Sequence, residues 1–192
     1  MRHCDDVIAI SETVRVAKVY AYWACVNYRE AHGLFVSNGI LFNHESEKRG
    51  FEFLTRKVSH GVARIHHGLA KMTTLGNLDA KRDWGYAPEF VDLMGRILQH
   101  KEPDDFVGAT GEAHSVREFV EEAFRVAGII DWEKHVMIDP KNFRPSEVYN
   151  LRGNTTKAQR ILGWKAKTKF KDLARIMVEA DIKDLEEIRG SK

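Results

Sequence analysis

The chain has 192 residues, of which 43% are apolar and 30% charged, with 14 Gly and only 4 Pro. This composition is globular and excludes a collagenous, low-complexity or mainly disordered protein. Lys and Arg total 30 against 28 Asp and Glu, so a net charge of +2 lacks the basic field of a general nucleic-acid binder. At roughly 100–200 residues per domain, the length predicts one domain, or at most one and a half.

Neither a membrane span nor a disulfide framework is indicated. The longest apolar run, Val19 to Val26, is far too short to cross a bilayer, and the N-terminus is acidic where a secretory signal needs apolar residues. Cys4 and Cys25 alone make no disulfide framework, and the nine His show no metal-ligand spacing. We expect a soluble, cytoplasmic protein that binds no metal, membrane or nucleic acid.

The predicted elements alternate between helices and strands in chain order. Helices are predicted over 14–32, 53–67, 88–98, 115–126, 156–162 and 170–188, and strands over 34–41, 72–75, 106–107 and 135–138. Polar loops are predicted over 43–51 and 76–87. A capping box, Ser115 with Glu118, opens one helix, and Gly163 ends another. The alternation indicates α/β architecture.

One helix is predicted to bury an apolar stripe. Its residues are Phe90, Val91, Met94, Ile97 and Leu98.

The spacing of the glycines bears on cofactor binding. No two of the fourteen are two residues apart, so G-x-G-x-x-G, the phosphate-cradling turn of a dinucleotide fold, does not occur in the chain.

The loop 43–50 follows a predicted buried strand, and ligands of α/β folds bind beyond the carboxyl ends of strands. Asn43, His44 and Arg49 there could bind phosphate or amide groups. The alternative, a solvated loop of mixed charge, is favoured by loop statistics alone. The sequence therefore leaves both interpretations open for this loop.

Two further segments carry candidate ligands. Arg82 can grip a diphosphate with two hydrogen bonds, although an exposed Arg82–Asp83 region is the alternative. Trp84 slightly favours a packed, ordered loop there. In 144–147, the Glu147 carboxylate can accept from two neighbouring N–H donors of guanine, whereas a surface proline turn is the plainer interpretation.

Taken together, several ordered strings resemble one family, the GDP-mannose 4,6-dehydratases. They lie at 38–46, 75–85, 110–119, 144–148, 157–158 and 162–165. The resemblance runs from about Ala17 to the C-terminus, and residues 1–16 do not share it. It implies part of a Rossmann-like sheet plus the small α/β substrate-binding domain of an extended short-chain dehydrogenase/reductase. On that view 17–192 form the C-terminal part, and the N-terminal dinucleotide-binding half is missing.

The resemblance also implies a reaction and a site. The family uses NADP to convert GDP-mannose to GDP-4-keto-6-deoxymannose by internal hydride transfer and loss of water, on the route to GDP-fucose or GDP-rhamnose. By resemblance, Lys18, His44 and Arg49 contact NADP, and Lys18 is also the catalytic lysine. The implied GDP-mannose residues are Asn43, Leu54, Lys57, Asn77, Arg82, Arg144 and Glu147.

The sequence departs from the family at two positions. The catalytic tyrosine precedes the family's lysine by four residues, where this chain has Val14, which cannot transfer a proton. Tyr20 and Tyr22 are not clear replacements. Tyr149 stands where the family has Asp, which weakens that corner of the implied site.

Three hypotheses follow from these departures. The first is a truncated dehydratase half that is inactive alone. The second is a non-catalytic GDP-sugar-binding module or pseudoenzyme that forms homo-oligomers or pairs with a full-length relative. The third is a degraded gene product with no role. Because the expected fold lacks half of its sheet, we also expect uncovered apolar surface on the helix at 14–26.

Overall fold

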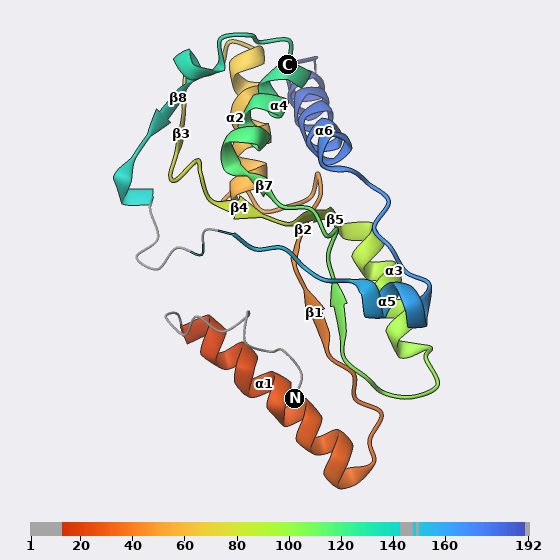
Figure 1. The fold of residues 1–192 in the computed structure, drawn as a ribbon. Coiled ribbons are helices and arrows are strands. Elements are labelled where there is room, and N and C mark those ends of the chain that lie inside the picture. Colours follow the sequence, from red (N-terminus) through yellow and green to blue (C-terminus); the bar gives the residue numbers. More distant parts are fainter. Residues whose placement is uncertain (1–12, 143–147, 149, 191–192) are drawn as a thin grey trace.

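The computed structural model describes residues 13–142, 148 and 150–190 (Figure 1). The helices are α1 (Thr13–His32), α2 (Leu54–His66), α3 (Ala87–Leu98), α4 (Val116–Val126), α5 (Thr156–Leu162) and α6 (Phe170–Gly190), with short 3₁₀ helices at Trp132–His135 and Pro140–Asn142. The strands are β1 (Gly39–Leu41), β2 (Asn43–Glu45), β3 (Thr73–Leu75), β4 (Lys81–Arg82), β5 (Trp84–Tyr86), β6 (Phe106–Gly108), β7 (His114–Ser115) and β8 (Val136–Ile138). The predicted α/β class is confirmed.

Two hydrophobic cores organise the molecule. The upper core in Figure 1 lies between α2, α4 and α6 and buries Val62, Phe119 and Met177 completely. The lower core lies between α3, α5 and the β1–β6 strand pair. There Phe90 meets Trp164 edge to face with ring centroids 5.7 Å apart. Each core is therefore built from helices that bury one face.

Short strands connect the two cores. β1 and β2 form one extended run, in which β1 pairs with β6 and β2 pairs with β5, both in parallel. Between them, the Phe42 amide donates to the Gly108 carbonyl at 2.8 Å. β4 pairs antiparallel with β7, and β3 pairs parallel with β8. We call β2, β4, β5 and β7 the waist, because they lie between the two cores (Figure 1).

The helix predictions are confirmed to within a few residues, and so are two of their end signals. Ser115 Oγ accepts from the Glu118 amide at 3.1 Å, and Glu118 Oε2 accepts from the Ser115 amide at 2.6 Å. Gly163 ends α5 with a φ of 62°, in the left-handed region that glycine enters without strain. These signals are local in sequence, which is why the sequence reveals them.

The strand and loop predictions need correction. Of the predicted strand 34–41, only Gly39–Leu41 pairs with a neighbour, and residues 34–38 are irregular. The predicted loops 43–51 and 76–87 contain β2, β4 and β5. These strands are two or three residues long and owe their existence to distant partners, so no local pattern marks them.

The predicted stripe on α3 is also too wide. Phe90 and Ile97 are buried, but Val91, Met94 and Leu98 are exposed. The reason is that α3 packs against α5 and the strands β1, β2, β5 and β6 with one face. Helical periodicity identified the helix correctly but overestimated how much of it a neighbour covers.

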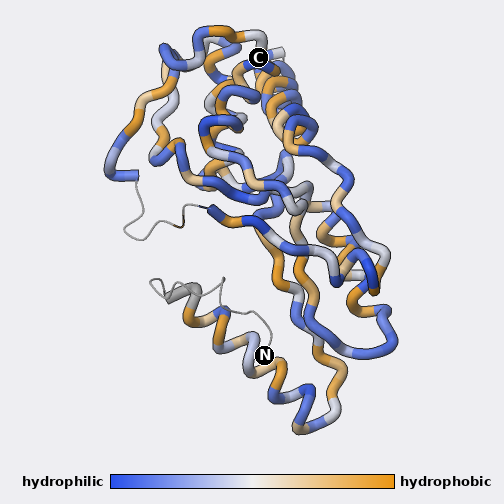
Figure 2. The backbone as a smooth tube through the Cα atoms, viewed as in Figure 1, coloured by the Kyte–Doolittle hydropathy of each residue, from blue (hydrophilic) through white to orange (hydrophobic). Residues whose placement is uncertain are grey.

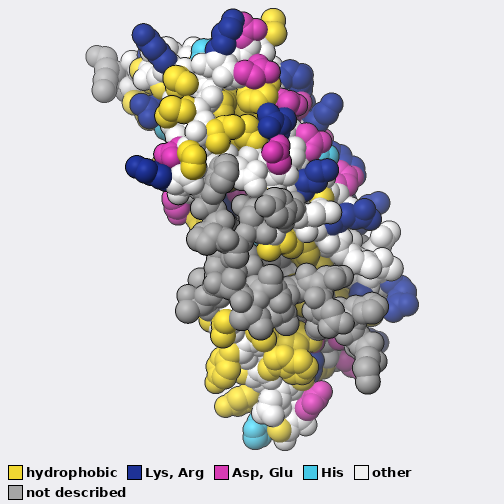
Figure 3. Space-filling view, turned by 60° about the vertical axis from the view of Figure 1, so that its left-hand side comes forward, with side chains coloured by type: hydrophobic (Ala, Val, Ile, Leu, Met, Phe, Trp, Pro, Cys, Tyr) yellow, Lys and Arg dark blue, Asp and Glu magenta, His cyan; other side chains and the backbone are white. Residues whose placement is uncertain are grey.

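The apolar side of α1 is uncovered in this structure, as expected. Val16, Tyr20 and Trp23, which recur at helical spacing, are 51%, 77% and 58% exposed. Hydrophobic colouring recurs along α1 in Figure 2, and hydrophobic side chains gather at the lower end of Figure 3. Among the helices of the described part, none is long and apolar enough to cross a membrane.

The two glycines Gly85 and Gly95 provide a matched test of the packing around Phe90. A Cβ on Gly85 would lie 2.3 Å from Phe90 Cε2, whereas one on Gly95 meets nothing within 4 Å. We expect Gly85→Ala to lower the free energy of unfolding by about 1–3 kcal/mol through overpacking. Gly95→Ala, in the interior of α3, should raise it by about 0.5–1 kcal/mol. Urea unfolding measures both, and a change of the same sign in both would contradict this packing.

Candidate functional site

Three of the predicted site residues lie together on the waist. Asn43 and His44 occupy β2, opposite Trp84 and Gly85 of β5. Arg82 ends β4, two residues before Trp84 in the chain. The parallel pairing of β2 with β5 therefore brings side chains from two predicted loops onto neighbouring strands, near the carboxyl end of the β1–β6 pair.

His44 is held by its own chain. Its Nδ1 lies 2.9 Å from the carbonyl oxygen of Phe42, which requires Nδ1 to carry the proton. Its ring stacks on Phe90 of the lower core with centroids 5.2 Å apart. The imidazole is therefore fixed between the waist and α3.

Arg82 is half-buried and is oriented by backbone carbonyls. Its Nη1 donates to the carbonyl of Val148 at 2.5 Å and to that of Lys81 at 2.8 Å. Val148 directly follows the segment that carries two other predicted ligands, Arg144 and Glu147. Both of those residues lie outside the described residues. Arg82 thus fastens Val148 to β4.

A buried carboxylate follows on the same strand as Asn43. Glu45 is 2% exposed, accepts from Thr55 Oγ1 at 2.5 Å and faces Arg49 Nε at 3.3 Å. Burial raises the pKa of Glu45, and the Thr55 hydroxyl and Arg49 oppose that rise only in part. The Arg49 guanidinium also lies over the Phe53 ring, 3.6 Å from its centroid. The interpretation of this loop as uniformly solvated is therefore wrong.

The remaining predicted substrate residues flank the waist. Leu54 begins α2 and packs against the upper core, and Lys57 is half-buried one turn later. Asn77 closes a turn, since its Oδ1 accepts from the Asp79 amide at 2.9 Å. The Oδ1 atom of Asn77 thereby shapes the loop that leads into β4.

Sequence reasoning missed the most buried polar group of the waist. Asp83, interpreted as part of an exposed region, is 0% exposed. Its carboxylate accepts four hydrogen bonds, from Thr110, Gly111 and Gly153. Nothing near Asp83 in the sequence announces these donors. The only local signal was Trp84, which is 4% exposed and does pack in the upper core, as its ordered-loop interpretation implied.

Lys18 lies apart from the waist, exposed on α1. It forms no ion pair or hydrogen bond with any other residue that the structure describes. Val14 belongs to the same helix, four residues earlier. Tyr22, on the other side of Lys18, donates its hydroxyl to Asp105 Oδ2 at 2.9 Å. That bond occupies Tyr22 in fastening α1.

Asp105, just before β6, is the anchor of α1. It receives Arg29 Nη1 at 2.8 Å and Nη2 at 3.1 Å, together with the backbone and side-chain amides of Asn38. Burial alone would raise the pKa of Asp105, but the hydrogen bonds from Arg29, Asn38 and Tyr22 outweigh it and lower the pKa to about 2. One ionised carboxylate therefore ties the helix of Lys18 to the β1–β6 pair.

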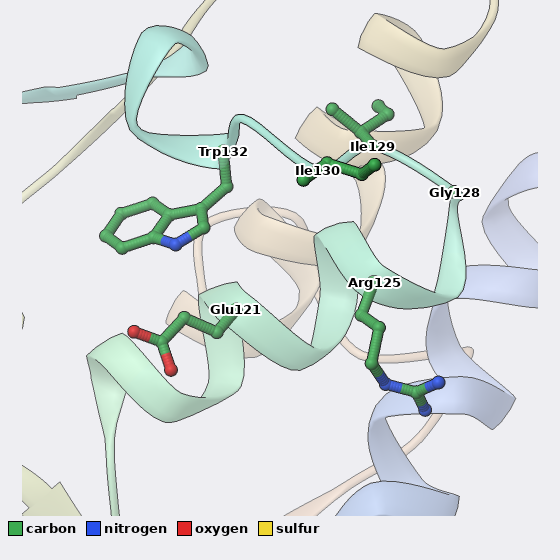
Figure 4. A pocket seen from close by; sticks show the side chains of 6 residues that line it. All are labelled: Glu121, Arg125, Gly128, Ile129, Ile130 and Trp132. Carbon is green, nitrogen blue, oxygen red and sulfur yellow. The ribbon is translucent and has the colours of Figure 1, made fainter.

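A hollow with a volume of about 260 Å³ lies elsewhere, on the outer side of α4 (Figure 4). It is lined by Glu121, Arg125, Trp132 and the turn at 128–130. It contains none of the predicted site residues. Within the described ranges, no group of His, Cys, Asp and Glu is placed to hold a metal ion.

The comparisons with known proteins agree with the strings in the sequence. The profile of the GDP-mannose 4,6 dehydratase family matches residues 15–177. The chain belongs to this family. It is 52% identical over 182 residues to GDP-mannose 4,6 dehydratase of Cricetulus griseus, covering 86% of this chain and 49% of that protein. The human GDP-mannose 4,6 dehydratase is 51% identical over the same shares.

The structural comparison identifies the fold. A structure of RMD from Pseudomonas aeruginosa complexed with NADPH superposes with a TM-score of 0.81 at 20% identity, covering 96% of this chain and 62% of that one. The fold is thus part of a Rossmann-type extended short-chain dehydrogenase/reductase. The chain spans about half the length of the curated relatives it matches.

The pKa of Asp105 generates a pH-dependent prediction. Asp105→Asn should lower the free energy of unfolding by about 1–3 kcal/mol at pH 7, because hydrogen bonds to a charged acceptor are lost. The folded-state pKa of about 2 lies below the ordinary 3.8, so the contribution is full above about pH 4 and disappears as the pH falls towards 2. Urea unfolding of both proteins across this range measures the difference.

Asp92→Asn is the control for that experiment. Asp92 pairs with Arg96 at 2.9 Å on the exposed face of α3, so its loss should change stability by less than about 0.5 kcal/mol at any pH. A wild-type advantage over Asp105→Asn that persists undiminished at pH 2 would contradict the assignment.

Proposed function

We propose that residues 17–192 form the nucleotide-sugar side of a GDP-mannose 4,6-dehydratase and bind GDP-mannose at the waist. One observation carries this proposal: the family match spans β2 and β4, the two strands of the waist on which Asn43 and Arg82 lie. Residues 1–16 are the part for which we propose no role in this site.

The chemistry of the predicted ligands suits a nucleoside diphosphate sugar. Arg82 offers a planar fork of N–H donors to phosphate oxygens, and Lys57 offers a second positive charge. Glu147 offers a carboxylate to the N–H edge of guanine. Leu54, Asn43, Asn77 and Arg144 complete the proposed pocket. Each of these assignments follows the family resemblance and the charge of the residue.

The proposed NADP residues fit the cofactor less well. Lys18 lies exposed on α1, and His44 is bonded to Phe42 and stacked on Phe90. Arg49 faces the buried Glu45. Two of the three groups are therefore engaged by this chain itself, and the residues present do not form a cofactor site on their own. We assign no reaction step to the cofactor here.

We further propose that these 192 residues alone do not dehydrate GDP-mannose. Val14 stands one helical turn before Lys18, where the family's proton-transferring tyrosine is expected, and an aliphatic side chain transfers no proton. Tyr22 is held by Asp105 and does not take over that role. Binding of the sugar nucleotide and its conversion are thus separate properties.

A second candidate function is a non-catalytic cytoplasmic module that binds a GDP-sugar and pairs with a full-length relative or with itself. The uncovered apolar side of α1 favours it, since Tyr20 is 77% exposed and Trp23 58% exposed. Apolar surface of this kind is a common feature of protein interfaces.

The binding proposal is tested by titration calorimetry with GDP-mannose and with GDP. Arg82→Ala should weaken binding of both by about 10–100-fold, because charge-assisted hydrogen bonds to phosphate are lost. Glu147→Gln should also weaken binding of both ligands, because the carboxylate that accepts from the N–H edge of guanine is lost. Arg175→Ala removes an exposed arginine of α6 and should leave affinity unchanged. An affinity that neither Arg82→Ala nor Glu147→Gln changes would refute the proposed pocket.

The activity proposal is tested separately with the purified chain, GDP-mannose and NADP. We expect no GDP-4-keto-6-deoxymannose above the protein-free background, while a full-length relative assayed in parallel produces it. Keto-sugar formation that increases in proportion to the concentration of this chain would contradict the predicted inactivity.

A further inference from the structure

The carboxylate of Asp83 joins the waist to two other segments of the chain by hydrogen bonds. Asp83 is the single residue between β4 and β5, and its side chain is completely buried. Oδ1 accepts from the Thr110 amide at 2.8 Å and from the Thr110 hydroxyl at 2.7 Å. Oδ2 accepts from the amides of Gly111 at 2.9 Å and Gly153 at 3.1 Å. Among the ion pairs of the described part, none involves Asp83, so four N–H and O–H donors stabilise its charge.

These donors come from two segments that are remote in sequence. Thr110 and Gly111 follow β6, and Gly153 precedes α5. The segments touch closely, because a Cβ on Gly153 would lie only 2.2 Å from Ala109 Cβ. Gly111 has a φ of 81°, which favours glycine. The backbone at this point has little room for a second arrangement.

The residue before Asp83 is the proposed diphosphate ligand. Arg82 donates to the Val148 carbonyl, while Lys81 pairs with Asn150 and accepts from the Leu151 amide. Asp83 then binds Gly153 of the same segment. Three successive residues of the β4 region therefore hold residues 148, 150, 151 and 153, and among the described contacts of these three only Asp83 also binds the turn after β6.

We propose that Asp83 is a positioning residue of the nucleotide-sugar site, whose carboxylate sets the direction of Arg82 and the place of the 150–153 segment beside it. The inference rests on the proposed function, because it concerns binding at the same waist. Asp83 is completely buried, so in this proposal it acts through Arg82. An asparagine in its place keeps one accepting oxygen but puts an N–H₂ donor where the other carboxylate oxygen accepts two hydrogen bonds, so the four bonds cannot all be kept.

The first experiment measures the affinity for GDP-mannose by calorimetry under conditions where circular dichroism shows each variant folded. Asp83→Asn should weaken binding at least tenfold. Asp105→Asn is the matched control, because it also removes the charge of a carboxylate that accepts several hydrogen bonds, but at the anchor of α1. It should lower stability and leave the affinity within twofold of wild type.

A second variant covers the case in which Asp83→Asn does not fold. Thr110→Val removes one donor to Asp83 and keeps the shape of the side chain, and we expect a loss of about threefold in affinity. In an Arg82→Ala background the same change should alter affinity by less than twofold, because its effect runs through Arg82. A merely structural role would weaken binding equally in both backgrounds.

The outcomes separate the two proposals. If wild type does not bind GDP-mannose, the proposed function fails, and this inference fails with it. If wild type binds and loses affinity with Arg82→Ala, but folded Asp83→Asn or Thr110→Val binds like wild type, only the positioning role is overturned. Equal weakening by Asp83→Asn and Asp105→Asn overturns it too, because the effect then reflects general destabilisation.

Discussion

The structure depends on one extended run of chain, Gly39–Glu45, that pairs first with β6 and then with β5. Because both pairings are parallel, each requires a long crossover. The crossover from β2 to β5 contains α2 of the upper core, and the one from β1 to β6 also contains α3 of the lower core. The amide of Phe42, bonded to Gly108, marks the point where one partner gives way to the other. The site lies where this exchange occurs, and for that reason it draws on segments far apart in sequence.

Buried and half-buried carboxylates compensate for the shortness of the strands. Strands of two or three residues leave backbone amides without sheet partners, and Asp83 and Asp105 accept several of them. Glu45 accepts a hydrogen bond from a side-chain hydroxyl instead. The pKa values of Asp105 and Glu45 shift in opposite directions for this reason. Asp105 gains a guanidinium and amides that outweigh its burial, and its pKa falls, whereas burial dominates at Glu45, and its pKa rises.

The sequence predicted what is encoded locally. Helix periodicity, the Ser115–Glu118 capping box and the glycine at 163 each depend on residues within a turn of one another. The family strings also point to Asn43, His44 and Arg82 as candidate ligands, a prediction that rests on resemblance. No local pattern predicts the strands of the waist, because their partners are distant, or the burial of Asp83, because its donors lie near residues 110 and 153. An aspartate between an arginine and a tryptophan carries no local mark of burial.

The parallel pairs also bear on how the chain folds. Gly39 pairs with Phe106, Asn43 with Trp84, and Thr73 with Val136, and the described residues include no strand pair joined by a tight hairpin turn. Such pairings give a high contact order, since the entropy of closing each long loop is lost before the hydrogen bonds form. Docking of α2, α4 and α6, which brings the strands together, should therefore precede strand pairing and limit the folding rate.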